Sequence, residues 1–495
     1  MDNKINFPSA MAKFFIFSSL VFLFSCETYK TSIPSLYTAK LDNGLTLFIM
    51  EKDTVPLAYI EIAVKGGGIA QTKENAGLFH LYEHLMFKGN EKFPTAAAVQ
   101  RAINDLGVTE WNGSTGTEFV NYYFTVPSDL VYQGIEFWSA AIRTPLLNPR
   151  EFENEKKVVV SEIEGRNADT SAIFHAALQK NLFPEHTHRL DPGGTPETIQ
   201  NATLAQLLEI KNKYYVPNNT ALFIGGDVDH KKIFKMVNEI FGDWQPADDP
   251  FATPPPQFDR NPLKQPRYLV QADPKISPSL AAVSVFFRGP DTDYDVQSTY
   301  ASDVFCELLA NPFGEYKNTL LNNQNFGILD PDHISSYYAT YRQSGQFVFS
   351  ATMSKIDVDL PQRIIDFGNH LQKTFSTIAT SDVYFTDEQF QMVFQRILDT
   401  GMYSRETARD FLSELRFWWA SASEDYFFSY ASNMQKVTYL DIQNLLNTYL
   451  VRKKPLIMVR VHPSVYETGK ANFDAMGFSE ITAENAFYHT AENEL

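Results

Sequence analysis

Cysteine and positive charge are both scarce in this chain. Only Cys26 and Cys306 occur among its 495 residues, too few for a framework of disulfides, so packing must hold the fold together. The 42 basic residues are outnumbered by 59 acidic ones, which gives a formal net charge of -17. Because a protein that follows a phosphate backbone needs excess basic residues, we expect no nucleic-acid partner. An acidic surface can attract cationic peptides or serve solubility alone.

The apolar run near the N-terminus is too short to span a bilayer. It reads FFIFSSLVFLF, covers residues 14–24 and follows two lysines, which is the pattern of an export signal, so we predict a signal peptide over residues 1–25. The run ends in LFSC, which resembles a bacterial lipobox. We therefore expect lipidation of Cys26 and a lipid-anchored protein of the bacterial cell envelope, facing the periplasm or the surface. Because Phe24 is bulkier than the residue usual in that motif, a secreted protein or a signal anchor is the alternative.

Composition and element order predict a folded chain made of two similar halves. Hydrophobic residues make up 44% of the chain, enough to bury a large core and to exclude overall disorder. In the first half, a strand ends in glycines at 57–68, and a strand is followed by an amphipathic helix at 219–244. Residues 279–290 and 454–478 repeat these two patterns. Chance similarity of strand-then-helix patterns is the alternative to this duplication.

A proline-rich polar segment separates the two halves. It covers residues 245–266 and reads QPADDPFATPPPQFDRNPLKQP, a composition typical of linkers. We therefore predict an α+β fold, with one domain at 36–244, the linker, and a related domain at 267–495.

The segment AGLFHLYEHLMFKG, residues 76–89, predicts a metal site on a helix. Apolar residues surround most of the helix circumference, so the helix should be largely buried. His80 and His84 lie one turn apart on one face, where both imidazoles can bind one ion at the ~2.0–2.1 Å that zinc requires. Glu83 lies on the adjacent face, where its carboxylate can take a proton from an activated water. The order HxxEH inverts the more familiar HExxH.

A third ligand is expected from the segment NPREFENEKKVVVSEIEGR at 148–166. Glu155 and Glu162 are seven residues apart, which places them two helical turns apart on one face. One carboxylate can complete the metal site while the other supports a ligand. A solvated acidic helix face is the alternative interpretation of this pair.

These motifs together resemble the pitrilysin family of zinc metallopeptidases, the inverzincins, which include insulin-degrading enzyme and the mitochondrial processing peptidase. The resemblance covers nearly all of the chain after the signal and is strongest in the first half. It is carried by HLYEH at 80–84, EWNGSTGTEFVNYYFTVP at 110–127, NEKKVVVSEIEG at 154–165 and YYVPNNTALFIGGDVD at 214–229.

The resemblance implies a role for each candidate residue. His80, His84 and Glu162 would bind one zinc ion per chain, and Glu83 would be the general base. Glu155 would support one of the ligands without binding the metal itself. Manganese or cobalt would be accepted by the same donors in vitro.

The resemblance also implies how substrate is held. Family members bind a peptide as an added strand on an exposed sheet edge, which Asn112–Phe124 resembles, and Asn112 would lie near the substrate backbone. Gly113 and Val120 depart from the alanine and threonine that are commoner in the family. A turn residue is the alternative interpretation of Asn112.

The second half departs from the family in one respect. Related single-chain enzymes, and some partner subunits, carry an arginine and a tyrosine seven residues apart that reach the substrate near the zinc. Here Asn322 to Asn325 stand where the arginine is expected, and the second half has no HxxEH. We therefore expect a heterodimer in which a related zinc-less subunit supplies the arginine and tyrosine, or else a homodimer. The two halves of this chain would form half of a clamshell, or a whole one.

The leading functional hypothesis is a zinc-dependent endopeptidase for unfolded peptides or small proteins. A maturation protease that removes a leader from one dedicated peptide is a variant of it. An inactive scaffold or binding subunit of an envelope complex is the main alternative, but it would not need Glu83. A purely structural zinc is disfavoured because such sites are closed by four protein ligands that usually include cysteine.

Overall fold

The computed structural model describes residues 29–30, 33, 35–108, 110–403 and 405–490. The predicted signal peptide at 1–25 and the predicted lipidation site, Cys26, lie outside the described residues. Within the described part, no helix has the length and apolar character needed to cross a membrane.

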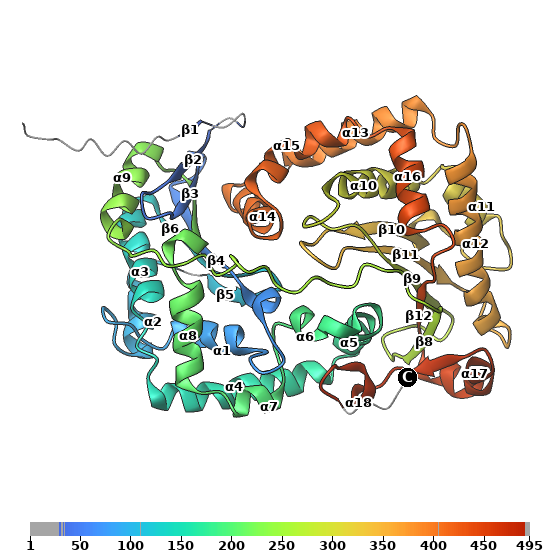
Figure 1. The fold of residues 1–495 in the computed structure, drawn as a ribbon, viewed down its shortest axis with the longest axis horizontal. Helices are drawn as coiled ribbons and strands as arrows, with labels where there is room; N and C mark the ends of the chain where they lie inside the picture. Colours follow the sequence, from blue (N-terminus) through green and yellow to red (C-terminus); the bar gives the residue numbers. More distant parts are fainter. Residues whose placement is uncertain (1–28, 31–32, 34, 109, 404, 491–495) are drawn as a thin grey trace, which may run out of the picture.

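The first half is built on a seven-stranded sheet with the order β1-β2-β3-β7-β4-β6-β5 (Figure 1). Its strands are β1 (Tyr29–Lys30), β2 (Leu36–Lys40), β3 (Thr46–Glu51), β4 (Leu57–Lys65), β5 (Trp111–Thr115), β6 (Phe119–Pro127) and β7 (Thr220–Gly226). Strands β3 and β7 are parallel, and the other neighbours are antiparallel. Strand β5 is therefore an edge strand of this sheet.

The helices of the first half mostly cover one face of this sheet. They are α1 (Leu78–Met86), α2 (Ala96–Asp105), α3 (Val131–Arg143), α4 (Pro149–Asn167), α5 (Thr170–Leu182), α6 (Thr187–Leu190), α7 (Pro196–Gln200), α8 (Leu204–Tyr214) and α9 (His230–Phe241). Short 3-10 turns occur at Gly67–Ala70, Ser128–Leu130, Pro184–His186 and Pro217–Asn219.

Local signals explain where the two metal-site helices begin. Helix α4 starts at Pro149, whose fixed φ suits the first turn, and the Asn148 side chain accepts hydrogen bonds from the next two free backbone N–H groups. Helix α1 starts after Gly77, which has a φ of 86° and packs so closely that a Cβ would lie 2.6 Å from the Gly193 carbonyl oxygen. The helix thus begins two residues after the start of the segment 76–89 that predicted it.

The second half repeats the sheet of the first. Its strands are β8 (Arg267–Ala272), β9 (Ala281–Arg288), β10 (Ile334–Ala339), β11 (Gln346–Met353), β12 (Leu456–Val461) and β13 (Phe478–Glu480). The order β8-β12-β9-β11-β10 reproduces β3-β7-β4-β6-β5, with the same parallel and antiparallel neighbours. The predicted α+β fold with two similar halves is confirmed.

Several helices accompany the sheet of the second half. They are α10 (Val296–Ala310), α11 (Glu315–Leu321), α12 (Leu360–Thr380), α13 (Asp387–Tyr403), α14 (Ala408–Ser421), α15 (Glu424–Met434), α16 (Tyr439–Tyr449), α17 (Pro463–Ala475) and α18 (Ala483–Ala486), with a 3-10 turn at Pro331–His333. Residues 245–266 between the two halves contain neither helix nor strand, but Phe258 within them is buried.

Each half contributes one helix to the sheet of the other half. Helix α14 packs on the open face of the first sheet, where Trp419 meets Phe223 at 5.9 Å between ring centroids. Helix α5 packs on the second sheet, where Leu178 and Phe286 belong to one buried cluster. Figure 1 shows α14 beside the first sheet and α5 beneath the second. Because each exchanged helix buries apolar area of both halves, the two halves stabilise one another.

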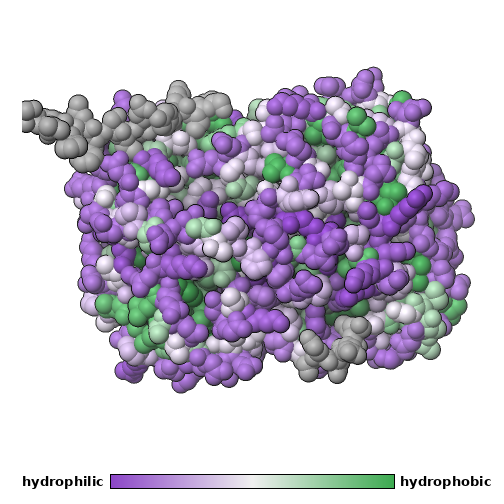
Figure 2. All heavy atoms as spheres, viewed as in Figure 1, coloured by the Kyte–Doolittle hydropathy of each residue, from purple (hydrophilic) through white to green (hydrophobic). Residues whose placement is uncertain are grey.

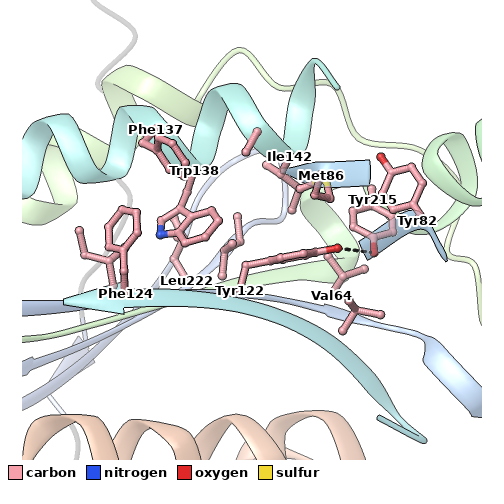
Figure 3. Close-up of a cluster of buried hydrophobic side chains, with 14 of the residues drawn as sticks. Val64, Tyr82, Met86, Tyr122, Phe124, Phe137, Trp138, Ile142, Tyr215 and Leu222 are labelled. Carbon is pink, nitrogen blue, oxygen red and sulfur yellow. Dashed lines mark hydrogen bonds between the residues drawn. The ribbon is translucent and has the colours of Figure 1, made fainter. Parts of the chain in front are cut away.

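The core of the first half holds α1 in place. Figure 3 shows Tyr82 and Met86, both on α1, in one cluster with aromatic residues of the sheet and α3. In the same cluster Trp138 stacks on Phe124 at 4.7 Å, and the hydroxyls of Tyr122 and Tyr215 are 3.0 Å apart. Burial of each large side chain contributes on the order of 1.5–3 kcal/mol, so this packing fixes the helix that carries the two histidines.

The face shown in Figure 2 is mainly hydrophilic, with a group of hydrophobic residues at the lower left of the view. The negative net charge agrees with this distribution.

A buried carboxyl joins the loop after β5 to the second half. Glu118 is 4% exposed, and its Oε1 accepts a hydrogen bond of 2.8 Å from the backbone N–H of Arg342. Burial raises the pKa of Glu118 to about 7, despite the opposing effect of the hydrogen bonds and of the Arg342 charge. Glu118 thus joins the two halves through a carboxyl group whose protonation changes near neutral pH.

We expect Glu118→Gln to stabilise the protein at alkaline pH. The folded pKa lies above the ordinary value of 4.5, so ionising the wild-type carboxyl lowers the free energy of unfolding as pH rises from about 4.5 to above 7. The variant should be more stable than wild type by about 1–3 kcal/mol at pH 8, with a difference that shrinks towards pH 4.5. Denaturant unfolding of both proteins between about pH 4.5 and pH 8 measures this difference in stability.

The exposed Glu110 provides a matched control. Its hydrogen bonds and ion pair with Arg409 lower its pKa, which is the opposite direction to Glu118. Glu110→Gln should therefore give no gain at pH 8. Equal stability of Glu118→Gln and wild type at that pH would contradict the expectation.

Candidate metal centre

Helices α1 and α4 bring three ligand atoms together. His80 Nε2 and His84 Nε2 are 3.2 Å apart, and Glu162 Oε2 lies 3.4 Å from the second and 3.7 Å from the first. The three side chains form a group able to hold one metal ion. The structure thus joins the three residues that the sequence and the family resemblance selected.

The spacing of these atoms fits a tetrahedral zinc site. A tetrahedron whose vertices lie ~2.0–2.1 Å from its centre has edges of about 3.4 Å, close to all three separations. Two imidazoles and one carboxylate are the donor set of a catalytic zinc, which keeps a fourth position open. Cys306 lies in α10 of the other half and is buried there, so it does not close the site. The donor chemistry therefore favours a catalytic metal over a structural one.

His80 is held in the form that binds metal. Burial, the neighbouring His84 and the charge of Arg166 lower the pKa of His80 to about 4. The imidazole is therefore uncharged at neutral pH, as a metal ligand must be.

Glu155 and Lys88 orient His84 from behind. Glu155 Oε2 lies 3.1 Å from His84 Nδ1, and its Oε1 lies 2.8 Å from the Lys88 ammonium. Burial favours the neutral form of His84, but the Glu155 hydrogen bond and the surrounding carboxylates outweigh it and raise the pKa of His84. Burial also opposes ionisation of Glu155, yet its bonds to His84 and Lys88 lower its pKa. This chain of contacts leaves His84 Nε2 facing the other ligands.

Glu83 is buried beside the ligands and anchored by β5. It is 8% exposed, and its Oε2 accepts a hydrogen bond of 2.7 Å from the Thr115 hydroxyl. Burial raises the pKa of Glu83, and the Thr115 bond counteracts part of this shift. One oxygen of the carboxylate is therefore fixed by the strand, and the other lies next to Gly113.

Gly113 provides the space that Glu83 occupies. A Cβ at this position would lie 2.9 Å from Glu83 Oε1 and 3.1 Å from Glu83 Cγ. Gly113 and Thr115 lie on the same face of β5, which is the face turned towards α1.

Asn112 lies on the exposed side of the edge strand. Its Oδ1 accepts a hydrogen bond of 3.0 Å from the backbone N–H of Gly113. Because β5 ends the sheet, its outer edge has backbone groups available for an added strand within the described part of the chain. A role of Asn112 in substrate binding stays a prediction.

Two residues that contact the site were absent from the sequence-based selection. Thr115 could have been suspected because it lies three residues after Asn112 in the predicted edge strand. Lys88 lies four residues after His84, which is the helical spacing that brings side chains to one face. The two contacts themselves could not be predicted without the fold, because Glu83 and Glu155 lie on other elements.

Comparison with known protein families assigns the whole site to one family. Residues 47–191 match the family described as insulinase (peptidase family M16), and residues 201–396 match the peptidase M16 inactive domain. The chain belongs to peptidase family M16, the insulinase or pitrilysin family. The resemblance inferred from the motifs is confirmed.

Curated relatives match less than half of this chain. The mitochondrial-processing peptidase subunit beta of Blastocladiella emersonii is 26% identical over 211 residues, which cover 43% of this chain and 45% of that protein. The probable zinc protease PqqL of Haemophilus influenzae is 25% identical over 217 residues, which cover 42% of this chain and 23% of that protein. The chain thus spans less than half the length of these relatives.

Solved structures share the fold of both halves. The first half of the periplasmic protease PqqL from Escherichia coli aligns with a TM-score of 0.72 and 17% identity, covering 90% of this chain and 97% of that one. Against the longer PqqL structure the TM-score is 0.71 at 16% identity, and the match covers 91% of this chain but 50% of that one. A protease from Helicobacter pylori aligns with a TM-score of 0.68 at 18% identity, covering 86% and 100%. The fold of this chain therefore corresponds to one half of PqqL.

We expect Glu155→Ala to weaken zinc binding without removing a ligand. Loss of the carboxylate that orients His84 should lower zinc affinity about 10–100-fold. Competition between the purified protein and a chromophoric chelator measures the affinity. Glu153→Ala is the matched control, because Glu153 lies on the same helix with a side chain 62% exposed. Wild-type affinity in Glu155→Ala would contradict this role.

Proposed function

We propose that this protein is a zinc-dependent endopeptidase that hydrolyses unfolded peptides or small proteins. The observation that carries the proposal is the convergence of His80, His84 and Glu162 beside the buried carboxylate of Glu83. Relatives named zinc proteases support the choice of zinc, one ion per chain. A maturation protease with one dedicated substrate would use the same residues.

The residues divide the chemistry between them. A bound zinc ion would supply Lewis acidity, lowering the pKa of a water towards ~7 and polarising the scissile carbonyl. Glu83 takes the proton of the attacking water on the oxygen that Thr115 does not hold, and it delivers that proton to the leaving amine. Glu155 keeps His84 correctly oriented throughout. A peptide added to the edge of β5 would bring its backbone past Glu83, with Asn112 beside it.

A second subunit would complete the enzyme. The fold corresponds to half of PqqL, and Asn322 to Asn325 stand where the family resemblance calls for an arginine. We propose that a related zinc-less chain, or a second copy, faces the metal centre and supplies the arginine and tyrosine. The Glu162 side chain is 48% exposed, which leaves it accessible to such a subunit.

The proposed location is the bacterial cell envelope, with a lipid on Cys26. The apolar run at 14–24 and the LFSC sequence support this location. A protein of the same fold is described as periplasmic.

An inactive scaffold is the competing function. It has the support that the family includes a domain described as inactive, which matches residues 201–396. The buried Glu83, held by Thr115 beside complete ligands, favours the enzyme, because a scaffold has no use for a buried ionisable group.

Cleavage of a library of unstructured peptides tests the proposal. The protein lacking residues 1–26 is expected to cut peptides, and Glu83→Gln should reduce the rate by about 10²–10⁴-fold while zinc content stays unchanged. If folded, zinc-loaded protein cuts nothing alone but gains activity with a related chain that carries the arginine and tyrosine, the heterodimer is supported. No cleavage under either condition would favour the scaffold.

We expect Gly113→Ala to slow the reaction with little change in zinc content. The added methyl group forces the Glu83 carboxylate to move by a few tenths of an ångström, which should lower kcat about tenfold and leave KM nearly unchanged. Gly165→Ala is the control, because no atom lies within 4 Å of a Cβ there. A wild-type kcat in Gly113→Ala would show that the position of Glu83 is not limiting.

A further inference from the structure

A buried carboxylate lies under α14, on the open face of the first sheet. Glu61 of β4 is fully buried and lies outside the group of metal ligands. The rest of this contact between the sheet and α14 is mainly apolar, with Phe223, Leu412 and Leu415 in one cluster. Because a buried charge costs free energy unless it is paired and hydrogen-bonded, the contacts of Glu61 must explain its presence here.

Glu61 is the centre of a chain of polar contacts that starts on α14. The Arg416 Nε atom lies 2.7 Å from Glu61 Oε1. The side-chain amide of Asn121, on β6, donates a hydrogen bond of 2.6 Å to the same oxygen, and the Tyr59 hydroxyl donates one of 2.9 Å to Glu61 Oε2. The Ser114 hydroxyl, on β5, donates a hydrogen bond of 2.5 Å to Asn121 Oδ1. The chain of contacts therefore leads from a helix of the second half to the edge strand β5.

A second contact joins α14 to the other end of β5. Arg409 donates hydrogen bonds of 3.1 and 2.9 Å to the two carboxylate oxygens of Glu110, the residue directly before β5. Arg409 and Arg416 are seven residues apart, so they lie two helical turns apart on one face of α14. Their guanidinium groups lie 5.1 Å from the Tyr123 ring and 4.2 Å from the Phe119 ring, both on β6. Helix α14 thus lies along β5 and β6 and contacts both ends of the edge strand.

The two contacts differ in strength. The side chains of Glu110 and Arg409 are 65% and 39% exposed, and ion pairs so exposed contribute little to stability. In the other contact Glu61 and Asn121 are buried, and the Arg416 side chain is 14% exposed. Loss of one partner there would leave buried polar groups without a hydrogen bond. The buried chain of contacts therefore contributes most of the coupling between α14 and β5.

Strand β5 is the element of the first sheet that most needs this support near the site. It has five residues and pairs with β6 alone, and such edges open locally at a lower free energy than central strands. Thr115 of this strand holds Glu83, and the outer edge of the strand would receive the peptide. A displaced β5 would disturb both functions.

We propose that Arg416 is a positioning residue: through Glu61 and the hydrogen bonds that lead to Ser114, it holds β5 where a peptide strand can add to it. The proposal rests on the proposed peptidase function. It gives the second half of this chain a role in peptide binding that needs no metal ligand and no group from another subunit.

Hydrogen exchange of the β5 amides tests the proposal without any peptide. The zinc-loaded protein lacking residues 1–26 is compared with its Arg416→Met variant, in which the amides of Trp111–Thr115 should exchange about tenfold faster. Asn121→Ala should have a similar effect. The double variant should exchange no faster than the more affected single variant, because both changes interrupt the same chain of contacts.

Further variants separate positioning from a loss of stability. Ser114→Ala interrupts the chain at its exposed end and keeps the buried pair, so it should accelerate β5 exchange even if Arg416→Met does not fold. Arg363→Met is the matched control, because Arg363 is a buried arginine that pairs with Asp357 within the second half. It should lower the thermal unfolding temperature and leave β5 exchange unchanged. Arg396→Met, at an exposed ion pair of α13, should change neither quantity.

Peptide cleavage supplies a second readout. With peptides long enough to lie along β5, Arg416→Met and Asn121→Ala should raise KM about tenfold, with a smaller effect on kcat and no change in zinc affinity. Arg363→Met should keep the wild-type KM, because a general loss of stability does not move the edge strand.

The outcomes separate the two proposals. Unchanged β5 exchange in the Arg416, Asn121 and Ser114 variants would overturn the positioning role, even if the wild-type protein cuts peptides. Equal acceleration in Arg363→Met, or faster exchange with an unchanged KM, would overturn it as well. Faster β5 exchange in the three variants alone, without cleavage of any peptide by the wild-type protein, would support the hold of α14 on β5 and count against the peptidase function.

Discussion

The structure depends on burial of the apolar faces of α1, which fixes where its two histidines point. Tyr82 and Met86 anchor this helix in the aromatic core over the first sheet, and His80 and His84 consequently face α4. Because Glu162 lies on α4, correct packing of α4 against α1 completes the ligand set. The ligand set is thus a product of helix packing, supported in the described part of the chain by Lys88 and Thr115.

The exchange of helices between the halves extends this constraint across the molecule. Helix α14 covers the first sheet and α5 covers the second, so each sheet is packed on both faces. The same exchange brings Glu118 against Arg342 and the segment after α18 against α5. Residues of the second half therefore border the site although they contribute no ligand.

Sequence patterns succeeded where the chemistry depends on a local period. The spacing of four between His80 and His84, and of seven between Glu155 and Glu162, follows from the helical repeat, and both helices are present. The choice of Glu162 as ligand and Glu155 as support came from family resemblance, because the period alone does not rank them. Lys88 and Thr115 were missed because each acts on a residue of a different element.

The sequence by itself determined the α+β class, the duplicated order of elements and the residue types of the metal site, since these follow from periodicity and donor chemistry. Only the tertiary structure decided that Glu83 fills the space left by Gly113 and that each half covers the sheet of the other. It also decided that Arg416 of α14 contacts Glu61 on the open face of the first sheet. These features depend on contacts between residues far apart in the chain, which become specific only when the whole core is packed.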